Sequence, residues 1–120
     1  PALEVWTAVQ SRPEPGLAIL TAGRRDVSYD LEMPIPIARA GRDERRPRPV
    51  PEGWRVTALN DQHAYLRWDA ADAAAEAAAP VVGERIALGI SHPCTTFDKW
   101  AWMPVVDDDY RVVDAVTTRF

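Results

Sequence analysis

Residues 54–69 read WRVTALNDQHAYLRWD and give the clearest indication of the fold class. Residues 54–61 and 63–69 each mix β-branched, aromatic and aliphatic side chains with polar ones, as strands do. The polar run Asn60, Asp61, Gln62 lies between them, which predicts a hairpin with a loop longer than a tight Asn-Gly turn. Because a hairpin is a unit of an antiparallel sheet, residues 54–69 favour a β-structure.

Short apolar runs of the same kind occur on both sides of this hairpin, and Gly or Pro residues separate many of them. They are residues 3–12, 17–23, 83–90, 100–106 and 110–120. Residues 26–37 alternate only partly, and their strand-like pattern stops at the prolines. The sequence therefore predicts an all-β domain of about seven or eight short strands, either a small β-sandwich or a partly closed barrel.

Two segments do not fit a strand pattern. Residues 38–53 are rich in proline and contain five arginines interleaved with acidic residues, which is typical of a solvated loop rather than of a basic binding patch. Residues 70–80 read AADAAAEAAAP and have high helix propensity but no large apolar side chain to dock with. We expect a short surface helix or a loose tether there.

The length of 120 residues fits one domain, residues 1–120. No apolar run approaches the roughly 20 residues that a membrane-spanning helix needs, so we expect no membrane segment. A formal net charge of −4 argues against nucleic acid as a partner. A single cysteine forms no intrachain disulfide, and a reducing cytoplasm is the simplest setting for it. The start at Pro1 favours a piece of a longer or processed protein.

Residues 89–110 read GISHPCTTFDKWAWMPVVDDDY and contain the candidate site. In an extended segment, residues i and i+2 point to the same side, so His92 and Cys94 are expected to present a nitrogen and a sulfur together. Nitrogen and thiolate ligands suit zinc, and two of them leave coordination positions open, as in a catalytic site. The alternatives are a buried cysteine beside a hydrogen-bonded histidine, or a Cys/His nucleophilic pair.

Other polar residues give weaker signals. His63 lies in the predicted hairpin and is more easily explained as a structural residue. Asp107, Asp108 and Asp109 lack the spaced oxygen ligands and the glycine of a calcium loop, so a solvated turn is expected. Lys99 is the only lysine of the chain, which matters for any chemistry that needs a Schiff base.

Four stretches occur in an order that resembles a known family: SRPEPGLAILTAGRRDVSYD, LNDQHAYLRW, VGERIALGISHPCTTFDKW and VVDDDYRVVDAV. Together they are similar to the C-terminal domain of the D-serine dehydratase and D-threonine aldolase family, and most similar to its bacterial D-serine deaminase branch. The resemblance covers nearly the whole chain apart from the Arg/Pro segment and the Ala-rich segment. It implies a β-domain like that of alanine racemase-type enzymes, packed against an N-terminal α/β barrel that binds pyridoxal phosphate.

The resemblance also implies a chemistry. In the dehydratase branch, a His and a Cys that match His92 and Cys94 bind zinc; the aldolase branch has an Asp in place of the Cys and uses a harder ion such as manganese. Cys94 therefore favours the dehydratase branch and the conversion of D-serine to pyruvate and ammonia. Pyridoxal phosphate would act as the electron sink, and zinc would activate the β-hydroxyl of the D-amino-acid substrate.

The chain departs from complete members of the family because it has no barrel and no glycine-rich phosphate loop. Lys99 follows the metal motif, whereas the cofactor lysine of the family lies near the start of the barrel, so Lys99 is not assigned that role. The isolated chain is expected to be inactive. His63 matches a family stretch and is left as either an active-site wall residue or a structural one. The family habit implies a homodimer. The alternative is a stand-alone β-module with a binding or regulatory role.

Overall fold

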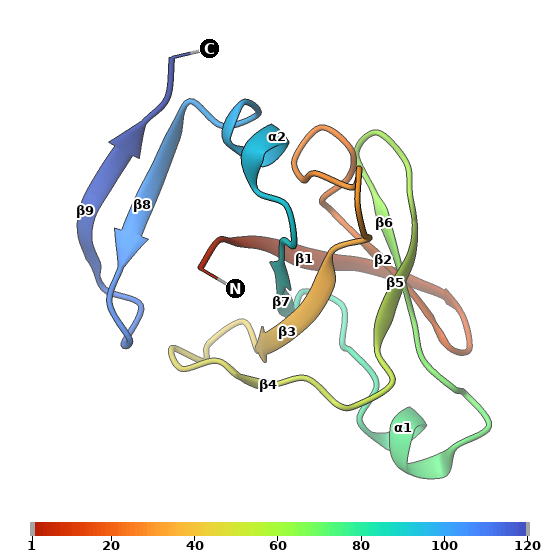
Figure 1. Ribbon diagram of the computed structural model, residues 1–120. Coiled ribbons are helices and arrows are strands. Elements are labelled where there is room, and N and C mark those ends of the chain that lie inside the picture. The colour runs from red at the N-terminus through yellow and green to blue at the C-terminus, as the bar shows by residue number, and fades with distance from the viewer. Residues whose placement is uncertain (1, 120) are drawn as a thin grey trace.

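The computed structural model describes residues 2–119 and consists almost entirely of β-strands, which confirms the predicted all-β class (Figure 1). A seven-stranded antiparallel sheet has the order β4-β3-β7-β1-β2-β6-β5, and a separate hairpin is formed by β8 and β9. The strands are β1 Glu4–Glu14, β2 Leu17–Leu20, β3 Ile35–Ala40, β4 Arg48–Pro49, β5 Arg55–Leu59, β6 Ala64–Arg67, β7 Arg85–Gly89, β8 Trp102–Val106 and β9 Val112–Thr117. Two short helices are α1 Ala73–Ala77 and α2 Cys94–Phe97.

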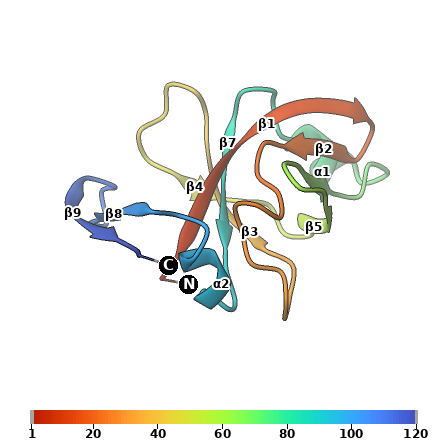
Figure 2. The ribbon, with the colours of Figure 1, turned by 90° about the horizontal axis from the view of Figure 1, so that it is seen from above.

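The large sheet curls into a partly closed barrel (Figures 1 and 2). Its long strand β1 pairs through Glu4–Ala8 with β7 and through its second half with β2. Register shifts along the pairing with β2 mark bulges, which bend a strand and increase its twist. As a result β3 contacts β5, although four strands lie between them in the sheet order.

The core fills the inside of this curl. Its largest fully buried side chains come from different strands: Val9 of β1, Leu20 of β2, Leu66 of β6, and Ile86 and Leu88 of β7. Along some of these strands apolar and polar residues alternate, and along others the residues are continuously apolar. The reason is that the curled sheet buries one face of a strand, and in places both faces. Burial of such apolar area, at about 25 cal/mol per Å², is the main stabilising term of the domain.

The hairpin predicted for residues 54–69 is present as β5 and β6, with Leu59 opposite Ala64. Its loop lies directly against the segment that follows β2. At Gly23 a Cβ atom would come within 2.4 Å of the backbone nitrogen of His63 and 2.5 Å of the carbonyl oxygen of Asn60. Glycine is therefore required at position 23 by close backbone approach, and this contact positions the loop of residues 23–33.

The predictions for residues 26–53 need two corrections. A strand does not stop at the prolines: Pro36 lies inside β3, opposite Leu88 of β7. Proline is tolerated because β4 pairs only with Ala38 and Arg39, so Pro36 lies on an open edge. The expectation of a fully solvated arginine loop is also wrong for Arg39, which is only 5% exposed.

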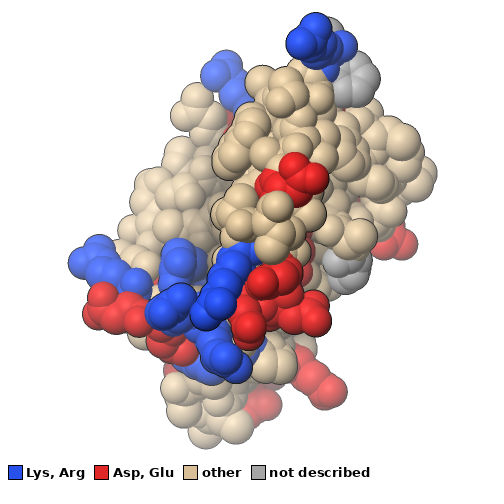
Figure 3. Space-filling view, turned by 90° about the vertical axis from the view of Figure 1, so that its left-hand side faces the viewer, with Lys and Arg blue, Asp and Glu red and all other residues tan. Residues whose placement is uncertain are grey.

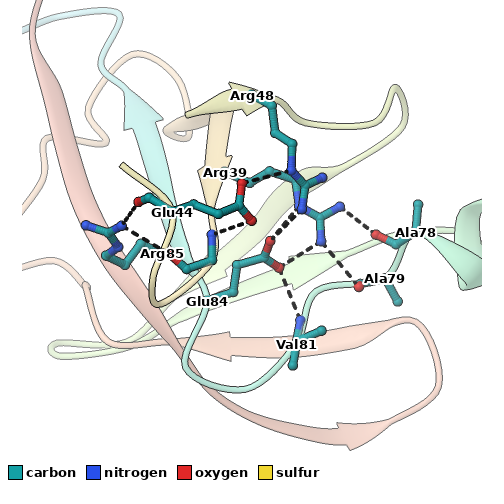
Figure 4. Close-up of polar contacts among 9 residues, drawn as sticks. Arg39, Glu44, Arg48, Ala78, Ala79, Val81, Glu84 and Arg85 are labelled. Carbon is teal, nitrogen blue, oxygen red and sulfur yellow. Dashed lines mark hydrogen bonds and ion pairs between the residues drawn. The ribbon is translucent and has the colours of Figure 1, made fainter. Parts of the chain in front are cut away.

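Arg39 forms a buried ion pair with Glu84 (Figure 4). Its Nε and Nη2 atoms donate to the two Glu84 oxygens at 2.6 and 2.8 Å, and its Nη1 donates to the carbonyl of Ala78 at 2.7 Å. The guanidinium also lies over the Trp54 ring, 4.8 Å from its centroid. The pair thereby connects β3 to the end of α1 and to the turn before β7, where Glu84 Oε1 also accepts from the Val81 amide.

The Ala-rich segment forms the short helix that was expected. Helix α1 begins after Asp72, whose carboxylate accepts from the amides of Ala74 and Ala75 as an N-cap. Glu76 of this helix accepts from Trp68 Nε1 at 2.8 Å and pairs with Arg12 at 3.0 Å. No helix within residues 2–119 is long and apolar enough to cross a bilayer.

The C-terminal hairpin lies beside the curled sheet and is not part of it. Strand β8 begins at Trp102, so Trp100 precedes the strand. Trp100 Nε1 donates to the carbonyl of Asp26. On the side of the molecule where β8 and β9 lie, charged side chains gather in the lower half of the surface and most of the upper half is uncharged (Figure 3). The turn at residues 107–109 is confirmed: Asp107 Oδ1 accepts from the amides of Asp109 and Arg111.

Candidate functional site

The segment of the candidate site begins where β7 leaves the sheet. Ile90 is still buried, and the chain then turns through Ser91 into the single turn of α2. The amides of Thr96 and Phe97 donate to the carbonyl of Pro93 at 2.9 and 3.0 Å and close that turn. His92 is half-buried and Cys94 is exposed, so the imidazole and the thiol lie at the surface, at the start of the turn.

The extended geometry expected for this segment is wrong. Cys94 is the first residue of α2, and Pro93 has helical dihedrals, φ −77° and ψ −14°. Proline is well suited to the start of a helix because its amide would be unpaired there and its φ is already fixed. The i and i+2 relation of a strand therefore does not hold between His92 and Cys94, although both residues lie in one short turn.

A buried network of hydroxyl groups anchors this turn. Ser28 lies in the loop after β2, and its amide donates to Thr96 Oγ1 at 2.8 Å. Thr96 Oγ1 donates to Ser28 Oγ at 2.9 Å, and Ser28 Oγ donates to the carbonyl of His92 at 2.5 Å. Thr96 is fully buried and Ser28 is 3% exposed, so the network fixes the backbone on both sides of Cys94 from within the core.

The His92 side chain pairs with Asp30, a residue that the sequence did not single out. Nδ1 of His92 lies 2.7 Å from Oδ2 of Asp30, and both side chains are partly exposed. The hydrogen bond from His92 lowers the pKa of the Asp30 carboxyl below its ordinary value. Asp30 is the last residue of one of the stretches that carry the family resemblance, and that was the available signal. Asp30 and His92 are 62 positions apart in the sequence, so local spacing could not predict their contact.

The other two residues that the sequence singled out, His63 and Lys99, make contacts of their own. His63 lies in the turn between β5 and β6, where its Nε2 is 3.1 Å from Oε1 of Gln10. Lys99 is half-buried just after α2, and its amide donates to the carbonyl of Thr96. Within residues 2–119 no three His, Cys, Asp or Glu side chains form a group that could hold a metal ion.

The curled β-sheet holds a surface turn that offers one imidazole and one thiol, and this arrangement defines the chain as a small β-domain. The chain belongs to the family described as "Putative serine dehydratase domain", whose model matches residues 2–106. This confirms the resemblance to the C-terminal domain of the D-serine dehydratase and D-threonine aldolase family.

One solved structure supports the same assignment. The chain is similar to a D-threonine aldolase from Filomicrobium marinum, with 27% sequence identity and a TM-score of 0.65. The match covers 86% of this chain but only 23% of the aldolase chain, so the chain spans about a quarter of that enzyme's length. A search of curated proteins gave no match.

Proposed function

We propose that residues 1–120 are the metal-binding domain of a pyridoxal-phosphate-dependent D-amino-acid lyase of the D-serine dehydratase type. His92 and Cys94 would be its two ligands to zinc. The observation that carries the proposal is the anchored turn at the start of α2, which brings an imidazole and an exposed thiol to the surface. This turn lies inside residues 2–106, the part of the chain that matches the family model. The buried Ser28–Thr96 network holds that turn in place.

The donor set suits zinc. Imidazole nitrogen and thiolate sulfur are among its preferred ligands, whereas manganese and magnesium prefer carboxylate and carbonyl oxygens. Zinc held by two protein ligands has positions left for a substrate oxygen, and as a Lewis acid it would weaken the bond to a β-hydroxyl group. The residues of this chain would supply the two ligands, and the anchored turn would hold the backbone that carries them.

Pyridoxal phosphate would belong to another part of the enzyme. Lys99, the only lysine of the sequence, follows two residues after the end of α2. The sequence also has no glycine-rich phosphate loop. The cofactor and its Schiff-base lysine would therefore lie in an α/β barrel outside these 120 residues. The fraction of the aldolase chain that this domain matches, 23%, leaves room for such a barrel in an enzyme of similar length.

Titration of the 120-residue chain with Zn²⁺ and with Co²⁺ tests the metal site directly. Co²⁺ reports thiolate ligation by a charge-transfer absorption in the near ultraviolet, so it identifies Cys94 as a ligand. We expect one ion per chain for the wild type and loss of binding for His92→Ala and Cys94→Ser. His63→Ala is the matched control, because it removes the other histidine of the chain and should leave binding unchanged.

The outcomes separate the proposal from its alternative. Binding that survives Cys94→Ser, or that is lost equally in His63→Ala, would rule out the assigned ligand pair. If neither the isolated wild-type chain nor the full-length protein that contains it binds zinc, a non-catalytic β-module with a binding or regulatory role is the better description.

Aldol cleavage is a second candidate activity, and the similarity to a D-threonine aldolase favours it. A dehydratase breaks the bond to the β-hydroxyl oxygen, whereas an aldolase breaks the Cα–Cβ bond. The enzyme that contains this domain, assayed with D-serine and D-threonine, distinguishes the two by its products: a 2-oxo acid and ammonia for the dehydratase, and glycine and an aldehyde for the aldolase. Cys94 in place of a carboxylate ligand leads us to expect the 2-oxo acid.

A further inference from the structure

We propose that Asp30 is a positioning residue, which holds the His92 imidazole with its hydrogen on Nδ1 and so directs the lone pair of Nε2 toward the metal. This inference rests on the proposed function, because it assigns His92 as a ligand and adds the residue that orients it. Asp30 itself would not touch the metal.

The geometry of the pair carries the first step. Nδ1 of His92 and Oδ2 of Asp30 are 2.7 Å apart, which is the length of a charge-assisted hydrogen bond. An ionised carboxylate only accepts, so the hydrogen of this contact lies on Nδ1. Because a neutral imidazole carries a single ring hydrogen, Nε2 is then the unprotonated nitrogen. A histidine that gives one nitrogen to a carboxylate and the other to zinc is the usual arrangement in protein zinc sites.

The second step is that both ends of the contact are fixed from the core. Ser28 lies two residues before Asp30, and its hydroxyl donates to the carbonyl of His92 itself. Its amide is bound to Thr96 Oγ1, on the far side of Cys94. The loop that carries Asp30 is thus joined to the turn that carries His92 and Cys94 by one bond at His92 itself and by a buried bond beyond Cys94.

An ordinary surface ion pair would behave differently. Exposed pairs of this kind contribute little to stability, and their loss has small effects. A carboxylate that orients a ligand changes two properties that stability does not report: the ring nitrogen that carries the hydrogen, and the metal affinity. Loss of such an orienting partner typically weakens metal binding about 10–100-fold.

The test is long-range ¹H–¹⁵N NMR of the metal-free, ¹⁵N-labelled chain, at a pH above the ordinary titration range of imidazole. The two ring nitrogens of a neutral histidine have distinct shifts, so the spectrum shows which one is protonated. We expect the Nδ1–H form of His92 in the wild type and a shift toward the Nε2–H form in Asp30→Ala. Zinc titration of the same samples should show affinity about 10–100-fold lower in Asp30→Ala, with partial recovery in Asp30→Glu.

Asp43→Ala is the matched control, since Asp43 is an exposed aspartate of the β3–β4 connection and its removal changes the net charge equally. It should alter neither the tautomer nor the affinity. An unchanged tautomer in Asp30→Ala, or an unchanged zinc affinity despite a changed tautomer, overturns the inference. If the wild type binds no zinc, either as the isolated chain or within the full-length enzyme, the proposed metal site fails, and the NMR spectrum still decides separately whether Asp30 sets the His92 tautomer.

Discussion

Strands β7 and β9 have similarly apolar sequences but very different surroundings. Strand β7 reads RIALG, and four of its five residues are buried. Strand β9 reads VVDAVT, and all six of its residues are exposed. Strand β7 pairs with β3 on one side and β1 on the other, whereas β9 pairs with β8 alone. The difference teaches that a short apolar run is enough to form a strand, while the neighbours of that strand decide whether it is buried.

The two regions are also held by different forces. The curled sheet encloses a continuous apolar core and the buried Arg39–Glu84 pair. The hairpin β8–β9 is held to the sheet by contacts at its ends. Tyr110 donates to Oε2 of Glu4 at 2.9 Å and packs edge-on against Trp6 at a centroid distance of 5.6 Å. A groove of about 740 Å³, bordered by β1, α2 and β8, separates much of the hairpin from the sheet.

The largest effect is expected from breaking the buried ion pair. Glu84→Ala leaves the Arg39 guanidinium buried without its carboxylate, and the free energy of unfolding should fall by about 3–5 kcal/mol. Glu14→Ala is the control, because the Arg67–Glu14 pair is exposed and its loss should cost about 0–1 kcal/mol. Urea denaturation measures both. Equal losses in the two variants would mean that the sheet gains nothing special from this pair.

An intermediate effect is expected at the attachment of the hairpin. Burial, the hydrogen bond to Glu4 and the charge of Glu4 together raise the pKa of Tyr110 to about 12. A folded-state pKa above the ordinary value means that the neutral phenol stabilises the fold fully below about pH 10. That contribution is lost as the pH rises from 10 to 12. Ultraviolet titration should show a tyrosine step near pH 12 that disappears in Tyr110→Phe.

Tyr65→Phe is the control for that titration, since the Tyr65 hydroxyl accepts from Nδ2 of Asn60 within the other hairpin. It should retain the step near pH 12. Tyr110→Phe should also lower the free energy of unfolding by about 1 kcal/mol, the usual contribution of one hydrogen bond. Persistence of the late step in Tyr110→Phe would assign it to another group and would remove the argument that Glu4 holds the hairpin.

The smallest effect is expected on the outer surface of the hairpin. Val113 is 62% exposed, so Val113→Thr should change the free energy of unfolding by less than about 0.5 kcal/mol. The same substitution at Val9, which is 2% exposed, buries a hydroxyl group and should cost about 1–3 kcal/mol. Thermal unfolding of the two variants measures the contrast. A large loss in Val113→Thr would show that the hairpin is covered in solution.

Local sequence patterns were enough to locate most strands, the β5–β6 hairpin, the α1 helix and the acidic turn. Each of these depends on propensities and turn residues within a few positions of one another, such as Asp72 at the start of α1. The same local reasoning found His92 and Cys94 as a candidate pair, because they lie two residues apart. It failed on their conformation, since Pro93 begins a helical turn instead of continuing a strand.

Only the closure of the sheet decided the contacts between distant residues. Arg39 and Glu84 are 45 residues apart, and His92 and Asp30 are 62 apart. No local propensity encodes such contacts, because they exist only after β3 has paired with β7 and the loop after β2 has packed against α2. The burial of Arg39, the tolerance of Pro36 and the partner of His92 all follow from that packing. The amino-acid types of the site can be read from the chain, but their arrangement is a property of the folded sheet.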